Sequence, residues 1–148
     1  MRNMIRLFSI GLVLSAGAAC TSGEKKAPES VTTPGAATLP VEATPGPGGK
    51  YIEIAMTTDD KGSYFKPNEI EAKVGDVLRF KLVVGVHNVD FLPDSNGGKS
   101  GLPPVSGMLQ LPGQTQDILL NFGTGHFYFQ CDPHAALGMR GRVEVEPR

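Results

Sequence analysis

Three residue types that bind soft metal ions gather in one short segment of the chain. Cys131, His134 and Met139 follow one another in a C-x2-H-x4-M spacing, and His87 lies far earlier in the chain. A thiolate, two imidazoles and a soft thioether form the ligand set of copper centres that exchange single electrons. We therefore predict one copper site made of these four residues. Three ligands would lie on one loop between two strands, and His87 would come from an earlier strand.

Other chemistries fit this set of residues less well. A zinc site is possible in principle, but a methionine thioether is a poor zinc ligand. Enzymes with several copper centres need further histidines, and the chain has three histidines in all, so only His126 remains after His87 and His134. A binuclear copper site would need a second cysteine near Cys131, and the sequence has none there. We therefore expect a protein that is not an enzyme.

The residue pattern from residue 50 to residue 148 is typical of a β-sheet protein. Short runs of alternating apolar and polar residues are separated by Gly, Pro, Asn and Asp. Such a pattern favours an antiparallel β-sandwich or barrel, here of seven to eight strands. No amphipathic helix is evident, and residues 93–105 read as an irregular loop. We expect strands at 51–56, 69–74, 77–82, 87–91, 116–120, 126–130 and 141–145.

The first residues predict export. Arg2 and Arg6 flank a short apolar run that is too short to cross a bilayer, which takes roughly 20 apolar residues. Small residues then precede Cys20, and the segment 1–19 resembles a bacterial lipoprotein signal, although Gly17 stands where leucine is commonest. We expect Cys20 to be lipidated and the protein to lie on the periplasmic side of the cell envelope, anchored to the membrane. Conventional cleavage after Ala18 or Ala19 is the alternative.

Composition separates a tether from the folded domain. Residues 20–49 are rich in Pro, Gly and Thr and lack an apolar period, so we predict a flexible tether before a domain at 50–148. That domain has ten basic and twelve acidic residues, a net charge of −2. The absence of a basic excess argues against nucleic-acid binding. We expect a monomer whose encounters with partners are only weakly steered by charge.

The copper segment carries a family resemblance. Phe129, the run from Cys131 to His134 and the run from Gly138 to Gly141 resemble the copper loop of plastocyanins and halocyanins. The N-terminal half of these families is similar to Phe65, Pro67, Ile70, Gly75-Asp76 and His87-Asn88-Val89. The resemblance implies an all-β, cupredoxin-like Greek-key sandwich with one type 1 copper. His87, Cys131 and His134 would form a trigonal plane and Met139 the weak axial ligand, while Asn88 would tie the two ligand-bearing loops together.

The resemblance also implies a function. The protein would shuttle single electrons between redox partners, such as a c-type cytochrome or a membrane oxidoreductase, with the His134 edge as electron port and Ala136 and Leu137 around it. The chain departs from plant plastocyanins, because Gln130 stands where they commonly have tyrosine and no acidic cluster matches theirs. A periplasmic copper storage or delivery protein that uses the same ligands is the alternative.

Overall fold

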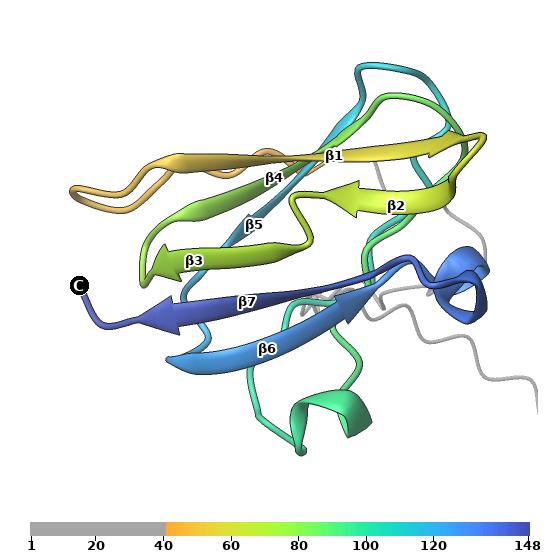
Figure 1. Ribbon diagram of the computed structural model, residues 1–148. Coiled ribbons are helices and arrows are strands. Elements are labelled where there is room, and N and C mark those ends of the chain that lie inside the picture. Colours follow the sequence, from red (N-terminus) through yellow and green to blue (C-terminus); the bar gives the residue numbers. More distant parts are fainter. Residues whose placement is uncertain (1–40) are drawn as a thin grey trace, which may run out of the picture. The chain divides into compact units, whose positions relative to one another are not determined.

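A computed structural model describes residues 41–148 of the chain. The predicted export signal at 1–19 and Cys20 lie outside these residues. Seven strands form two sheets in the described part, which confirms the predicted all-β sandwich (Figure 1). One sheet has the strand order β2-β1-β4-β5 and the other β3-β7-β6. The strands are β1 (Tyr51–Asp59), β2 (Gly62–Lys66), β3 (Glu69–Lys73), β4 (Val77–Leu82), β5 (Thr115–Leu119), β6 (Gly125–Gln130) and β7 (Arg140–Glu146).

The sheets are mixed, which differs from the antiparallel pairing that was expected within the sandwich. β1 pairs with β4 in parallel, and β3 pairs with β7 in parallel, whereas the other strand pairs are antiparallel. The chain leaves the first sheet after β2, forms β3 in the second sheet and returns for β4. Alternation of apolar and polar residues reports which side of a strand is buried, but it does not report the direction of the neighbouring strand.

Two of the predicted strand positions differ from the structure. β2 was not expected, and it forms a tight hairpin with β1 in which Asp59 lies opposite Gly62 and accepts a hydrogen bond from the backbone N–H of Lys61 at 2.8 Å. Residues 87–91 do not form a strand, because they make only single bridges, His87 with Leu109 and Asp90 with Gln130. The segment that carries His87 is therefore held by isolated backbone hydrogen bonds and not by a continuous strand pairing.

A cluster of phenylalanine rings fills the core near one end of the sheets. The ring of Phe129 lies 5.1 Å from that of Phe65, 5.2 Å from that of Phe80 and 5.5 Å from that of Phe91. A Cβ atom at Gly141 would lie 2.3 Å from the Phe129 ring, so β7 can pass this ring only with glycine at that position. Phe129 precedes Cys131 by two residues, so this packing anchors the strand that leads to the Cys131 loop.

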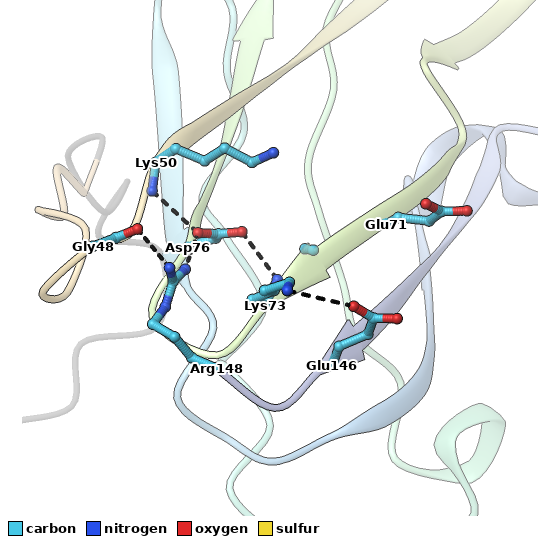
Figure 2. Close-up of a pocket in the computed structure, with 8 residues that line it drawn as sticks. Gly48, Lys50, Glu71, Lys73, Asp76, Glu146 and Arg148 are labelled. Atoms are coloured by element: carbon cyan, nitrogen blue, oxygen red, sulfur yellow. Dashed lines mark hydrogen bonds and ion pairs between the residues drawn. The ribbon is translucent and has the colours of Figure 1, made fainter.

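The turn between β3 and β4 is organised by a buried carboxylate. Asp76 is 1% exposed and accepts hydrogen bonds from the backbone N–H groups of Lys50, at 3.1 Å, and Lys73, at 2.9 Å. The guanidinium of Arg148 also pairs with it, as Figure 2 shows. Buried charges need such partners, so this arrangement joins the start of β1, the β3–β4 turn and the C-terminus. It lies at the end of the sheets away from the Cys131–Met139 loop (Figure 1).

Residues 41–49 lie against the domain, which differs from the free tether predicted for them. The backbone N–H of Asp117 in β5 donates to the carbonyl of Val41 at 2.9 Å, and that of Ala43 donates to the Asp117 carboxylate at 3.1 Å. The Tyr51 hydroxyl also donates to the carbonyl of Ala43 at 2.9 Å. These residues therefore cover an edge strand, a position that otherwise exposes unpaired backbone groups. The rest of the predicted tether, residues 20–40, lies outside the described residues.

Helical structure is limited to two short 3₁₀ segments in the described range. They are η1 (Asp94–Asn96), within the expected loop at 93–105, and η2 (Asp132–Leu137), which follows Cys131. Between residues 41 and 148 no helix has the length and apolar character that crossing a membrane requires.

Candidate metal centre

His87 is fully buried and held by its backbone and by its ring. Its backbone exchanges two hydrogen bonds with Leu109, at 3.1 and 2.8 Å. The ring Nε2 lies 3.0 Å from the carbonyl of Val84 and 3.2 Å from the hydroxyl of Thr58. A carbonyl accepts hydrogen bonds only, so this contact places the ring proton on Nε2 and leaves Nδ1 as a lone-pair donor.

The other candidate ligands lie on the loop between β6 and β7. Cys131 follows β6 in an extended conformation, and η2 then turns the chain so that the backbone N–H of His134 donates to the carbonyl of Cys131 at 3.0 Å. The backbone N–H of Cys131 donates to the carbonyl of Met139 at 3.1 Å, and that of Met139 to the carbonyl of His134, also at 3.1 Å. Gly138, with φ of 97°, supplies the left-handed residue that ends η2. The short spacing of the three residues therefore closes one compact loop.

Three candidate donor atoms face one another. Cys131 Sγ lies 3.6 Å from His87 Nδ1 and 3.4 Å from His134 Nδ1, and the two Nδ1 atoms are 3.2 Å apart. A point equidistant from three atoms at these separations lies about 2 Å from each, the length of a bond from a metal ion to an imidazole nitrogen. The thiolate and imidazole pair is a donor set that copper favours. These residues therefore fit a copper ion by both geometry and chemistry.

Met139 is also placed at this loop. Its side chain is 0% exposed, and its backbone is bonded to both Cys131 and His134. The structure thus brings the predicted axial residue into the loop that holds two of the other candidate ligands. Its role as a ligand stays a prediction.

Burial shifts the pKa of both kinds of candidate ligand. Burial lowers the pKa of His87, and the neighbouring His134 adds to this effect, so the ring is held in the neutral form that metals bind. Burial also raises the pKa of the Cys131 thiol, while backbone N–H groups of Asn88 and His134 act in the opposite direction. Metals bind the thiolate, so metal binding at this site releases a proton.

Asn88 joins the two segments that carry the candidate ligands. Its side-chain Nδ2 donates to Asp132 Oδ2 at 2.7 Å, and its side-chain Oδ1 accepts from the backbone N–H of Asp132 at 2.8 Å. Asp132 Oδ1 accepts a further hydrogen bond from the Gln130 side chain at 2.9 Å. Asn88 therefore links the two segments that carry the candidate ligands, and Asp132 is its partner.

The edge of the site toward solvent is apolar. His134 is partly exposed, Ala136 is exposed, and Leu137 is 75% exposed. Val84 and Val86, on the segment that leads to His87, are 51% and 45% exposed. These four apolar side chains belong to the two segments that carry the candidate ligands His87 and His134.

Sequence reasoning missed the groups that hold the His87 ring. Thr58 comes from β1, and the carbonyl of Val84 comes from the segment after β4. No local motif marks either group, because a threonine in a strand and a backbone carbonyl are features of any sheet protein. The nearest signal is Gly85, whose φ of +107° and closeness to His87 show that a side chain would not fit there.

Comparisons with known proteins point to copper binding. Residues 52–146 match the family model described as copper binding proteins of the plastocyanin/azurin family. Plastocyanin from Vicia faba is 33% identical over 99 residues, which cover 64% of this chain and 99% of that protein. Plastocyanin from Cucumis sativus is 34% identical over the same length, with the same coverage.

Solved structures show the same fold. Native pseudoazurin from Hyphomicrobium denitrificans superposes with a TM-score of 0.53 at 23% identity, over 64% of this chain and 74% of that one. A reduced form of an amicyanin mutant gives a TM-score of 0.52 at 24% identity, over 65% and 82% of the two chains. The predicted resemblance and the cupredoxin fold are confirmed. The chain belongs to the plastocyanin/azurin family of copper-binding proteins, and its cofactor is copper.

Proposed function

We propose that this domain carries single electrons between redox proteins of the cell envelope through one type 1 copper held by His87, Cys131, His134 and Met139. Membership of the family implies blue-copper electron transfer. The observation that carries the proposal is the assembly of three donor atoms at 3.2–3.6 Å from one another. A ligand set that is already in place rearranges little between the two oxidation states.

The residues around the ligands support this role by limiting movement. The Val84 carbonyl orients the His87 ring, and the Asn88–Asp132 pair joins the segment of His87 to the loop of Cys131. Bound copper supplies the one-electron couple, and a buried Met139 keeps water from that side of the loop. His134 is the one of the four that reaches the surface, so its ring offers the shortest route for an electron to a partner.

The central experiment replaces the thiolate. The wild-type domain should bind one copper and show an intense thiolate-to-copper charge-transfer band when oxidised. Cys131→Ser should remove the band and leave a folded, colourless domain. His126→Gln is the matched control, because His126 is exposed and outside the site, and this variant should stay blue. A Cys131→Ser protein that remains blue would exclude the proposed copper site.

Copper storage or delivery is the competing outcome. A shuttle should pass through many cycles of oxidation and reduction without losing copper to a mild chelator. Rapid stoichiometric transfer of copper to the chelator on reduction would favour delivery and contradict electron shuttling.

The proposed docking face surrounds the His134 edge and consists of Ala136, Leu137, Val84 and Val86. A small apolar contact with few charges suits a partner that must leave after each electron, such as a c-type cytochrome or a membrane oxidoreductase. Support comes from the exposure of these side chains next to the candidate ligands.

Leu137→Glu should slow electron transfer to such a partner, because a carboxylate at the centre of the contact must be desolvated. The copper absorption should change little, since Leu137 is not a ligand. Val41→Glu is the control, an exposed apolar residue paired with β5 away from the copper loop. Stopped-flow reduction of the partner measures the rate of electron transfer for both variants and for the wild type. Equal rates for Leu137→Glu and wild type would place the docking face elsewhere.

We further propose that the protein is anchored through a lipidated Cys20 on the periplasmic side of the envelope. The support is the sequence before Cys20, since this region lies outside the described residues. Cys20→Ala should release the protein from the membrane fraction while its copper band stays intact. An unchanged distribution would favour conventional cleavage or a retained signal.

A further inference from the structure

A second surface feature lies beside the copper loop, on the outer face of the β3-β7-β6 sheet. A hollow of about 270 Å³ is lined by Tyr128 of β6, by Arg140 and Arg142 of β7, by Glu69 of β3 and by Gly138. Gly138 ends η2, and Arg140 directly follows Met139. A group bound in this hollow would therefore contact the same loop that carries Cys131, His134 and Met139.

The hollow has more positive than negative charge. Arg140 and Arg142 lie on the same face of β7, and both are exposed. Glu69 is directly opposite Arg142 in the strand register, so two guanidinium groups and one carboxylate line this hollow. Arg142 also borders an adjoining hollow that Glu71 and Glu144 line, so the positive side of the surface is the side of Arg140 and the copper loop.

The two arginines are available for binding. Arg140 uses its Nε to donate to the carbonyl of Ala135 at 2.9 Å, which directs the guanidinium along the copper loop and leaves its terminal nitrogens as donors. Among residues 41–148, the side chain of Arg142 makes no hydrogen bond or salt bridge. A guanidinium presents a planar fork of donors that matches a carboxylate in a two-point contact.

We propose that this hollow is a docking site for carboxylate side chains of an acidic redox partner protein. The inference rests on the proposed electron-transfer function and names the chemistry of the partner. The apolar face around His134 supplies a contact that excludes water, and the arginines orient the partner beside it by short-range attraction. Screening limits such attraction to roughly 10 Å at ordinary salt, so position near the copper loop matters more than the charge of the whole domain.

Binding of a small anion tests the site without electron transfer. Hexacyanochromate(III), a paramagnetic anion, is titrated into the reduced domain at low salt, and broadening of backbone amide signals is followed by NMR. We expect broadening at residues 138–142. Arg142→Gln should weaken anion binding roughly threefold, as for the loss of one exposed ion pair. Glu69→Gln should strengthen it by a similar factor, because it removes the opposing carboxylate.

Lys73→Gln is the matched control. It makes the same change of charge on the same sheet face, but Lys73 pairs with Glu146 at the far end of β3. This variant should bind the anion like the wild type. Equal weakening by Lys73→Gln and Arg142→Gln would show that only the overall charge matters and would overturn the proposal. Broadening confined to residues around His134 would also overturn it.

Kinetics separate this inference from the proposed function. Oxidation of the reduced protein by hexacyanoferrate(III), an anion, should slow with Arg142→Gln, whereas oxidation by the tris(phenanthroline)cobalt(III) cation should not. Unchanged rates with both reagents in a blue, redox-active protein would overturn the docking site alone. Loss of blue copper altogether would instead contradict the proposed function.

Discussion

At the scale of single residues, the orientation of the His87 ring depends on the close packing of the residues around it. The ring Nε2 is held between the Val84 carbonyl and the Thr58 hydroxyl, which directs Nδ1 toward Cys131 and His134. A Cβ atom on Gly85 would lie 2.6 Å from this Nε2 and 2.8 Å from the Thr58 hydroxyl. Glycine at position 85 is therefore a condition for the orientation of the ligand.

Gly85→Ala should displace the His87 ring and weaken copper binding by roughly tenfold, which is typical of changes to groups that orient a metal-bound histidine. Copper titration against a competing chelator measures the affinity, and the charge-transfer band should shift. Gly97→Ala is the control, because Gly97 also has a positive φ, +63°, but no atom lies within 4 Å of its added Cβ. Identical copper affinity in the wild type and Gly85→Ala would show that the ring does not need this space.

Among the elements, the β3–β4 turn depends on one carboxylate. Burial by itself would raise the pKa of Asp76, but hydrogen bonds from the backbone of Lys73 and Lys50 and from Arg148 outweigh burial and hold the pKa below its usual value. A carboxyl group whose pKa is lowered by folding stabilises the native state above its unfolded pKa, about 3.9. This contribution is lost as the pH falls through the folded pKa.

Asp76→Asn should destabilise the copper-free domain by about 2 kcal/mol at pH 7, because the donors around this position lose a charged acceptor. The difference from wild type should shrink as the pH falls below the unfolded pKa of about 3.9 and through the lower pKa of the folded state, because the wild-type carboxyl then becomes protonated. Urea unfolding at several pH values measures both effects. A difference in stability that does not depend on pH would mean that ionised Asp76 is not what stabilises the turn.

In the molecule as a whole, the segment before β1 belongs to the folded domain. Val41 and Ala43 bond to Asp117 of β5, and Gly46 donates to the carbonyl of Gly75 at 2.8 Å. These contacts lie away from the copper loop, at the strand ends near Asp76 and along β5 (Figure 1). They should therefore affect stability without affecting the copper site.

A domain that begins at Lys50 should be less stable than one that begins at Val41, by about 1–3 kcal/mol, because buried Asp117 loses hydrogen-bond partners. The two proteins should share one copper absorption spectrum. Thermal and urea unfolding of the copper-free forms compare their stabilities. Equal unfolding midpoints would show that residues 41–49 rest on the domain without stabilising it.

Features that depend on local order could be predicted from the sequence. The C-x2-H-x4-M spacing predicted a single loop for three ligands, because a turn of that length brings Cys131, His134 and Met139 together. Alternation predicted the all-β class, because burial of one strand face repeats every second residue. The residue type alone made His87 the fourth candidate ligand, and the family resemblance added Asn88, which no local pattern links to the loop.

Contacts between segments that are far apart in the sequence could be identified only from the tertiary structure. Alternation does not encode strand direction, so the parallel pairs β1–β4 and β3–β7 were missed, and residues 87–91 proved to be pinned by single bridges. The contact of residues 41–49 with β5 could not be foreseen, because backbone hydrogen bonds can order a chain that has no apolar pattern. The orientation of His87 likewise arises from contacts between separate segments. The register of β3 against β7, which sets Arg142 opposite Glu69, also depends on how distant parts of the chain come together.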